Sequence, residues 1–167
     1  AQKDEAPGRR RSVSLALQRL KADGHGEPPA PWCFILLGSA GRGESMLSAD
    51  QDNGLIHDGS DTDDEWFARL GEHVSDYLDE AGVPRCKGGV MAANAPWRGT
   101  VAVWHERVGT WLGRARPEDI LNVDIFFDLV PVAGERTLGN ALHRDAVQAA
   151  AQRPAFLGLL AASVASY

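Results

Sequence analysis

Two aspartates, Asp50 and Asp52, stand two residues apart in the stretch DQDNGLI. An extended chain directs residues i and i+2 to the same face, roughly 6 to 7 Å apart, so these two carboxylates should project together. Like charges on one face repel each other unless a cation lies between them, and a hard divalent ion such as Mg²⁺ suits carboxylate oxygens. The spacing therefore predicts a divalent-metal site at the start of a strand over residues 50–56.

A glycine-rich turn comes shortly before the two aspartates. It carries glycines, a hydroxyl and a planar cation, at Gly38, Ser39, Gly41, Arg42 and Gly43. Glycines let the backbone turn tightly and approach a ligand closely, while the arginine can counter negative charge. A short helix is expected over residues 44–48, so the free N–H groups of the turn would lie at a helix N-terminus, where phosphate is favoured. The turn predicts an anion cradle beside the metal site.

An apolar run, Trp32 to Leu37, precedes the turn and is bounded by Pro31 and Gly38. A short continuous apolar run is typical of a strand that is buried on both faces. We expect this strand to be the first core strand, followed by the turn, the short helix and the aspartate strand.

The order of glycine-serine turn, short helix and Asp-x-Asp strand resembles the nucleotidyltransferase superfamily. The words GSAGRGE and DQDN are more specifically similar to the nucleotidyltransferase domain of bacterial signalling proteins, which resembles the catalytic domain of PII-protein uridylyltransferases and often lies beside CBS or cyclic-nucleotide-binding modules. Further matching words are GGVM at residues 88–91 with Asn94 and Trp97, then Trp104 and Trp111, and IFFD at residues 125–128. The resemblance covers about Trp32 to Leu142. It implies an α/β (α+β) nucleotidyltransferase fold, with a small mixed β-sheet flanked by helices.

The resemblance also implies a chemistry, the transfer of NMP from an NTP with Mg²⁺ or Mn²⁺ to a protein or small-molecule acceptor in bacterial signalling. Metal-binding and catalytic roles fall on Asp50, Asp52 and Asp128, with Asp124 as the alternative third carboxylate, and Asp128 would help to deprotonate the acceptor. Triphosphate binding falls on the turn, at Gly38, Ser39, Gly41 and Arg42. The alternative is a catalytically silent nucleotide-sensing or interaction module that regulates neighbouring domains.

Hydrophobic spacing predicts the remaining elements. Residues 1–11 are polar and expected to be frayed or disordered, whereas residues 12–22 have helical spacing. Thr62 and Glu65 have the spacing of a capping box that opens a helix ending near Gly82. Later helices are expected over residues 99–113, for a short stretch from Pro117, and from Glu135 to just before Pro154. Alternation over residues 123–132 predicts a strand that carries Asp124 and Asp128 on one face.

These elements suggest three parts. Residues 1–31 form an N-terminal helix and linker, residues 32–150 the nucleotidyltransferase domain, and residues 151–167 the start of a following helical region in a longer parent chain.

Composition narrows the class of protein. The chain has 167 residues, 44% of them hydrophobic, and a formal net charge of -6, with Arg9–Arg11 as its local basic cluster, which argues against nucleic acid as a partner. Cys33 and Cys86 form no CxxC pair, so the spacing predicts neither a disulfide scaffold nor a zinc site and fits a reducing cytoplasm. No apolar run reaches the length of a membrane span.

The turn lacks the spacing of a dinucleotide fingerprint and of a P-loop. The tryptophans at 97, 104 and 111 are expected in the core rather than as base-stacking platforms.

Overall fold

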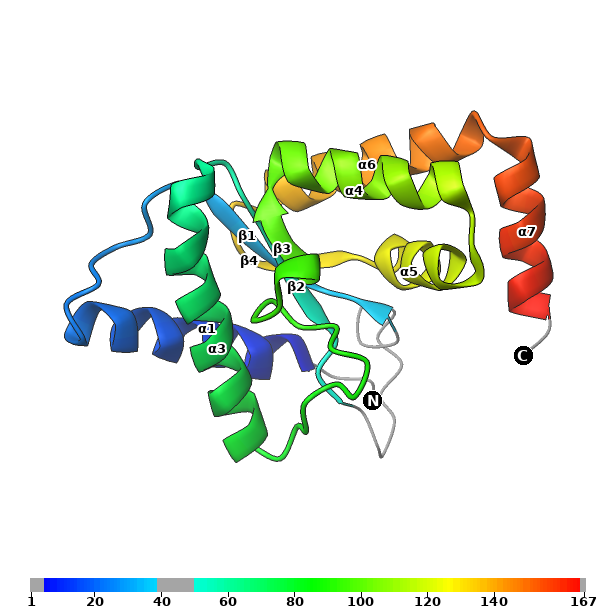
Figure 1. Cartoon of the computed structure of the whole chain (residues 1–167). Coiled ribbons are helices and arrows are strands. Elements are labelled where there is room, and N and C mark those ends of the chain that lie inside the picture. The colour runs from blue at the N-terminus through cyan, green and yellow to red at the C-terminus, as the bar shows by residue number, and fades with distance from the viewer. Residues whose placement is uncertain (1–4, 39–49, 166–167) are drawn as a thin grey trace.

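The computed structural model describes residues 5–38 and 50–165 of the chain. Its strands are β1 (Trp32–Leu36), β2 (Asn53–His57), β3 (Arg98–Thr100) and β4 (Val130–Gly134), and they form one sheet in the order β3-β2-β1-β4. Its α-helices are α1 (Glu5–Ala22), α3 (Asp64–Glu80), α4 (Val101–Arg114), α5 (Pro117–Phe127), α6 (Arg136–Ala151) and α7 (Pro154–Ala165). Single 3₁₀ turns precede α3 and β3, at η1 (Asp61–Asp63) and η2 (Ala95–Trp97). The expected small mixed sheet flanked by helices is confirmed (Figure 1).

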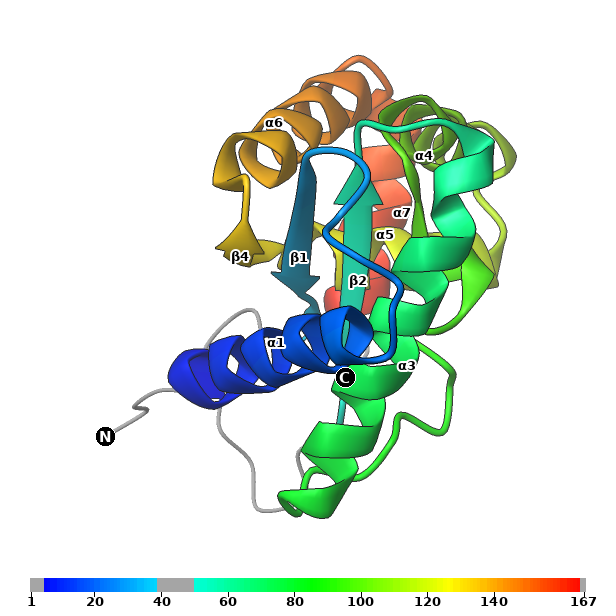
Figure 2. The same ribbon diagram turned by 90° about the vertical axis from the view of Figure 1, so that its left-hand side faces the viewer.

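The sheet contains both strand directions. β1 is antiparallel to its neighbours β2 and β4, whereas β2 and β3 run parallel. The opposite directions of β1 and β2 are visible in Figure 2, where their arrowheads point to opposite ends. β4 is an edge strand, a position that tolerates Pro131 because one side of an edge strand needs no ladder hydrogen bond.

Helices cover both faces of the sheet, and β1 is therefore buried on both sides. Phe34 and Leu36 belong to one apolar cluster, together with residues of α1 and α3. Cys33, Ile35 and Leu37 point the other way, into a larger cluster with residues of α4, α5, α6 and α7. Figure 1 shows the two helix groups on opposite sides of the strands. This burial explains the continuous apolar run of β1.

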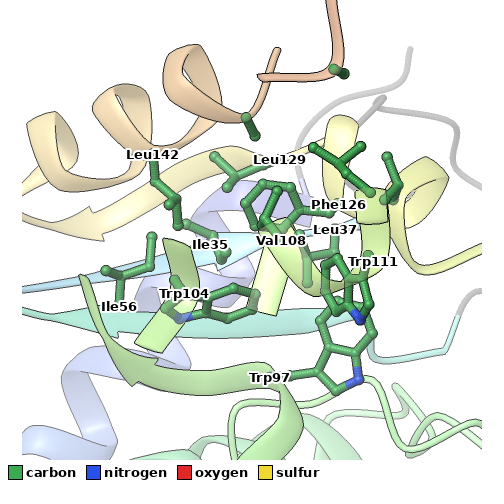
Figure 3. Packing of buried hydrophobic residues seen from close by; sticks show 14 of the residues in the cluster. Ile35, Leu37, Ile56, Trp97, Trp104, Val108, Trp111, Phe126, Leu129 and Leu142 are labelled. Atoms are coloured by element: carbon green, nitrogen blue, oxygen red, sulfur yellow. The ribbon is translucent and has the colours of Figure 1, made fainter. Parts of the chain in front are cut away.

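Tryptophans fill the larger core, as expected. Trp97, Trp104 and Trp111 are at most 6% exposed and pack against one another, and Trp104 and Trp111 also pack with Phe126 (Figure 3). The Trp104 indole Nε1–H donates a hydrogen bond to the carbonyl oxygen of Leu55 at 2.9 Å, so its polar atom is satisfied inside the core.

Helix α1 begins earlier than predicted. It starts at Glu5, so the expectation that residues 1–11 are frayed is wrong for residues 5–11. The reason is a buried stripe at helical spacing, formed by Arg9, Val13, Ala16 and Leu20, all at most 5% exposed. Val13, Ala16 and Leu20 of this stripe pack in one apolar cluster with Phe34 and Leu36 of β1.

The capping box ahead of α3 lies two residues before the predicted one. Ser60 and Asp63, rather than Thr62 and Glu65, make the reciprocal contacts, and the Ser60 N–H donates to Asp63 Oδ2 at 2.9 Å. Asp61–Asp63 then forms η1 and α3 follows at Asp64. The predicted end of the helix is confirmed, with Gly82 at φ 93° just beyond it.

The strand predicted over residues 123–132 is wrong for residues 123–129. Helix α5 continues to Phe127, and β4 begins only at Val130. Pro117 at the first turn and Asp119, whose carboxylate accepts the Arg116 N–H at 3.1 Å, start this helix. The buried residues Ile120, Val123 and Phe126 recur every three positions, so the apolar sequence fits a helix as well as a strand.

The other predicted helices are confirmed as α4 and α6, and α7 follows the break at Pro154. Among the described residues, no helix combines the length and apolar character needed to cross a bilayer.

Candidate metal and nucleotide site

The pairing of β1 with β2 brings the start of the glycine turn to the second aspartate. Leu36 is opposite Asn53, and the Leu37 N–H donates to the main-chain oxygen of Asp52 at 3.0 Å. Gly38 follows in a left-handed conformation, φ 58°, and a Cβ added to it would lie 3.3 Å from Asp52 Oδ2. The Asp52 carboxylate therefore lies directly against the backbone of the turn's first glycine.

Asp50 and Asp52 meet as their spacing predicts. One carboxylate oxygen of each and the Sγ of Cys86 all lie within 4.8 Å of one another, and all three residues are half-buried. Two carboxylates at this separation form a donor set that fits a divalent cation. Asp50, Asp52 and Cys86 are called the Asp-Asp-Cys cluster below.

The raised pKa of Asp52 also favours a cation at this pair of aspartates. Burial, together with the negative charge of Asp50, raises the pKa of Asp52 to about 6, against the lowering effects of a hydrogen bond from Cys86 and the positive charge of Arg9. The ionised pair is thus held in an environment that disfavours its charge, and a bound cation would relieve that cost.

Gln51 and Asn53, which alternate with the two aspartates, hold this stretch from its other face. Gln51 is fully buried, and its Nε2 donates to the carbonyl oxygens of Ser75 at 2.9 Å and Val83 at 3.1 Å. Asn53 is 1% exposed, and its Oδ1 accepts the Ala92 N–H at 2.8 Å. Because neighbouring residues of an extended chain alternate in direction, these inward anchors hold Asp50 and Asp52 outward.

The irregular segment between α3 and η2 is hydrogen-bonded to the aspartate stretch. The Gln51 N–H donates to the Pro84 carbonyl at 2.8 Å, and the Asn53 N–H donates to the Val90 carbonyl at 3.0 Å. These two hydrogen bonds, one on each side of Cys86 in the sequence, place this residue beside the aspartates. Sequence reasoning missed this cysteine, because no spacing relative to the aspartates indicated it.

A second missed residue is Arg9 on α1. It is 5% exposed, and its charge acts on the Asp52 carboxylate. Arg9 was missed because residues 1–11 were expected to be frayed. Its helical spacing to Val13, Ala16 and Leu20 could have indicated that it belongs to the buried face of the helix.

The predicted third carboxylate lies at the same end of the sheet. Asp128 caps the C-terminus of α5, two residues before Val130, which pairs with Leu36 of β1. Because Leu36 also pairs with Asn53, Asp128, Gly38 and Asp52 all flank one end of β1. Asp128 is not part of the Asp-Asp-Cys cluster among the described residues.

Four further residues are predicted for the site, Asp124, Ser39, Gly41 and Arg42. The alternative third carboxylate, Asp124, lies within α5. Ser39, Gly41 and Arg42, and the short helix expected over residues 44–48, lie outside the described residues.

The chain matches the model of a known protein family. The model of the family described as "Putative nucleotidyltransferase DUF294" matches residues 9–118, more than half of the chain. The chain belongs to this nucleotidyltransferase family. No curated protein matches it.

The matched region of this nucleotidyltransferase runs from Arg9 on α1 to Glu118 in α5. It includes the glycine turn and the whole Asp-Asp-Cys cluster. The motif words led us to expect a match over residues 32–142. The match begins before residue 32 and ends before residue 142, so the IFFD motif that contains Asp128 lies beyond its end.

Proposed function

We propose that this domain transfers NMP from an NTP to a protein or small-molecule acceptor in a metal-dependent reaction of bacterial signalling. The observation that carries the proposal is the contact between the Asp52 carboxylate and Gly38, with Asp50 beside them. It unites the metal-binding pair and the start of the phosphate-binding turn in one place. Membership of a nucleotidyltransferase family supplies the reaction class.

In this proposal Asp50 and Asp52 hold the divalent ion, Mg²⁺ or Mn²⁺. When bound, such an ion neutralises triphosphate charge and orients the α-phosphorus for in-line displacement of pyrophosphate. Gly38 leaves room for the triphosphate beside Asp52. Ser39, Gly41 and Arg42 are assigned to the phosphates from the sequence alone.

Asp128 is proposed as the third carboxylate. Its location at the end of α5, next to the end of β1, supports a role from the side opposite β2. There it would accept the proton of the acceptor nucleophile, whose attack needs general-base assistance. Arg9, whose positive charge acts on the Asp52 carboxylate, would offset the negative charge of the bound triphosphate.

The test is incubation of the protein with each of the four α-labelled NTPs, Mg²⁺ and candidate acceptors. Pyrophosphate release and label transfer are measured for the wild type, Asp50→Asn, Asp52→Asn and the exposed control Asp58→Asn. We expect turnover in the wild type and in Asp58→Asn, and its loss in the two site variants.

The alternative, a silent nucleotide-sensing module, gives a different pattern. NTP would bind with the same dependence on Asp50 and Asp52, yet no pyrophosphate would form. Equal pyrophosphate release from the wild type and Asp50→Asn would overturn the enzymatic proposal.

A further inference from the structure

The Cys86 thiol lies in the proposed metal site, beside Asp50 and Asp52. Its Sγ is within 4.8 Å of a carboxylate oxygen of both Asp50 and Asp52. Its half-buried position leaves it open to the same space as the carboxylates. A sulfur so placed can contribute a third donor to any ion that the pair binds.

The chain holds this cysteine on both sides. Upstream, the Pro84 carbonyl accepts the Gln51 N–H, and downstream the Val90 carbonyl accepts the Asn53 N–H. Between them, the Cys86 carbonyl accepts the Gly89 N–H at 3.1 Å, which closes a tight turn with Gly89 at φ 77°. Cys86 is thus tied to the residues that alternate with the aspartates, so its distance from them is set by the main chain.

We propose that the Cys86 thiolate is a ligand of the ion held by Asp50 and Asp52, and that the cluster therefore prefers a thiophilic divalent cation, such as Zn²⁺, Co²⁺ or Cd²⁺, over Mg²⁺. Thiolates favour these ions, whereas Mg²⁺ selects oxygen ligands and keeps its water. On binding, the S–H bond breaks, its proton leaves to water and the sulfur–metal bond forms, with no change of oxidation state. A thiophilic ion occupies the carboxylates that Mg²⁺ and NTP need, so it competes with them. The inference rests on the proposed function only in requiring that Asp50 and Asp52 bind a divalent ion.

The chain offers a matched pair of cysteine variants. Cys86 and Cys33 are its only two cysteines, and Cys33 is fully buried in β1 within the larger core. Cys86→Ser removes the sulfur at the site, while Cys33→Ala removes a sulfur that no site ion can reach. Circular dichroism confirms the fold of each variant before titration.

The decisive measurement is Co²⁺ titration of the reduced wild-type protein, followed in the near ultraviolet. A thiolate ligand produces a sulfur-to-cobalt charge-transfer band, which carboxylates alone do not produce. We expect the band in the wild type and in Cys33→Ala, and its absence in Cys86→Ser and in Asp50→Asn. Loss of an outer-shell partner alone weakens metal binding about 10- to 100-fold, so loss of a ligand should weaken Co²⁺ binding by at least about tenfold.

The cobalt spectrum of the wild type separates this inference from the proposed function. In Cys86→Ser, Co²⁺ affinity should fall more than Mg²⁺ affinity, and the charge-transfer band should be absent. If Co²⁺ binds through Asp50 without a band in the wild type, the thiolate is not a ligand and the inference fails, although the nucleotidyltransferase proposal stands. If neither Mg²⁺ nor Co²⁺ binds, both fail. The wild-type band decides the matter even where Cys86→Ser does not fold.

Discussion

The backbone of Gly38 lies against the carboxylate of Asp52, so closely that a Cβ would come within 3.3 Å of Oδ2. The first glycine of the turn thus serves two purposes. It adopts a left-handed conformation and it leaves the Asp52 oxygen open to a ligand. The two purposes can be separated by experiment.

Gly38→Ala should weaken metal binding. The added methyl group crowds Asp52, and the left-handed conformation costs about 1 kcal/mol of stability. Mn²⁺ affinity, followed by electron paramagnetic resonance, should fall about five- to tenfold, which is about 1 to 1.4 kcal/mol. Gly24→Ala is the matched control, because Gly24 is also left-handed at φ 85° but has nothing within 4 Å of the added Cβ. Equal Mn²⁺ affinity in both variants would count against crowding at Asp52.

Asp52→Asn should stabilise the metal-free domain while it removes metal binding. The folded pKa of Asp52, about 6, lies above the ordinary value, so the folded state favours the protonated form. Stability from this group is present at low pH and is lost as the pH rises through about 6. Above that pH the neutral amide should raise the free energy of unfolding by about 1 kcal/mol, after allowance for solvent screening at this half-exposed side chain.

The measurement for Asp52→Asn is thermal unfolding with a chelator, well above and well below pH 6. The variant should melt higher than the wild type above pH 6, and the difference should shrink below it. Asp58→Asn, at an exposed position, should show neither effect. A gain that does not depend on pH would refute ionisation as its cause.

Gln51→Ala should destabilise the domain. The buried amide donates to the carbonyl oxygens of Ser75 and Val83, and its loss removes both bonds inside the protein at a cost of about 2 kcal/mol. Gln51→Glu should cost more, because a carboxylate would face two carbonyl oxygens without a donor. Urea unfolding measures both, and the exposed Gln18→Ala should change stability by less than about 0.5 kcal/mol.

Asp64 supports the sheet through a buried network. Its carboxylate accepts hydrogen bonds from His57 Nε2 at 2.9 Å and Arg98 Nε at 3.0 Å. Burial alone would raise the pKa of Asp64, yet these bonds outweigh it and the pKa is lowered. The lowered pKa means that its stabilisation is present above the unfolded value and is lost as the pH falls through the folded value.

Asp64→Asn should therefore lower the free energy of unfolding by about 2 to 3 kcal/mol at neutral pH, because Arg98 is left without its carboxylate. The gap between wild type and variant should begin to narrow as the pH falls below about 4, the ordinary value of an aspartate, and should close once the pH has fallen through the lowered folded pKa of Asp64. Urea unfolding across this pH range tests both statements, with the exposed Asp79→Asn as control. A gap that stays constant into acid would show that the charge of Asp64 does not matter.

Much of the fold was predictable because burial patterns are local. The continuous apolar run of β1 and the three- and four-residue steps of α3 and α6 predict their elements correctly. Residues 117–127 could not be assigned in this way, since their apolar positions fit both a period of two and a period near three. The start of the helix at Pro117 and Asp119 decides it, and packing against the tryptophan core then fixes its buried face.

The site was predictable only where its parts are close in sequence. Asp50 and Asp52 meet because two-residue alternation brings them together, and Gly38 reaches them across one pair of strands. Cys86 and Arg9 arrive from a loop and a helix whose positions depend on tertiary packing, so no local pattern could connect them with the aspartates.

Helix α1 has a practical consequence for where this domain can be cut. Its buried stripe covers the face of β1 that carries Phe34 and Leu36, and the positive charge of Arg9 acts on the Asp52 carboxylate. A truncation that began at Trp32 would bare that apolar face and would remove the arginine at the same time. Such a fragment should self-associate through its uncovered sheet, and its failure to bind nucleotide would reveal nothing about the aspartates.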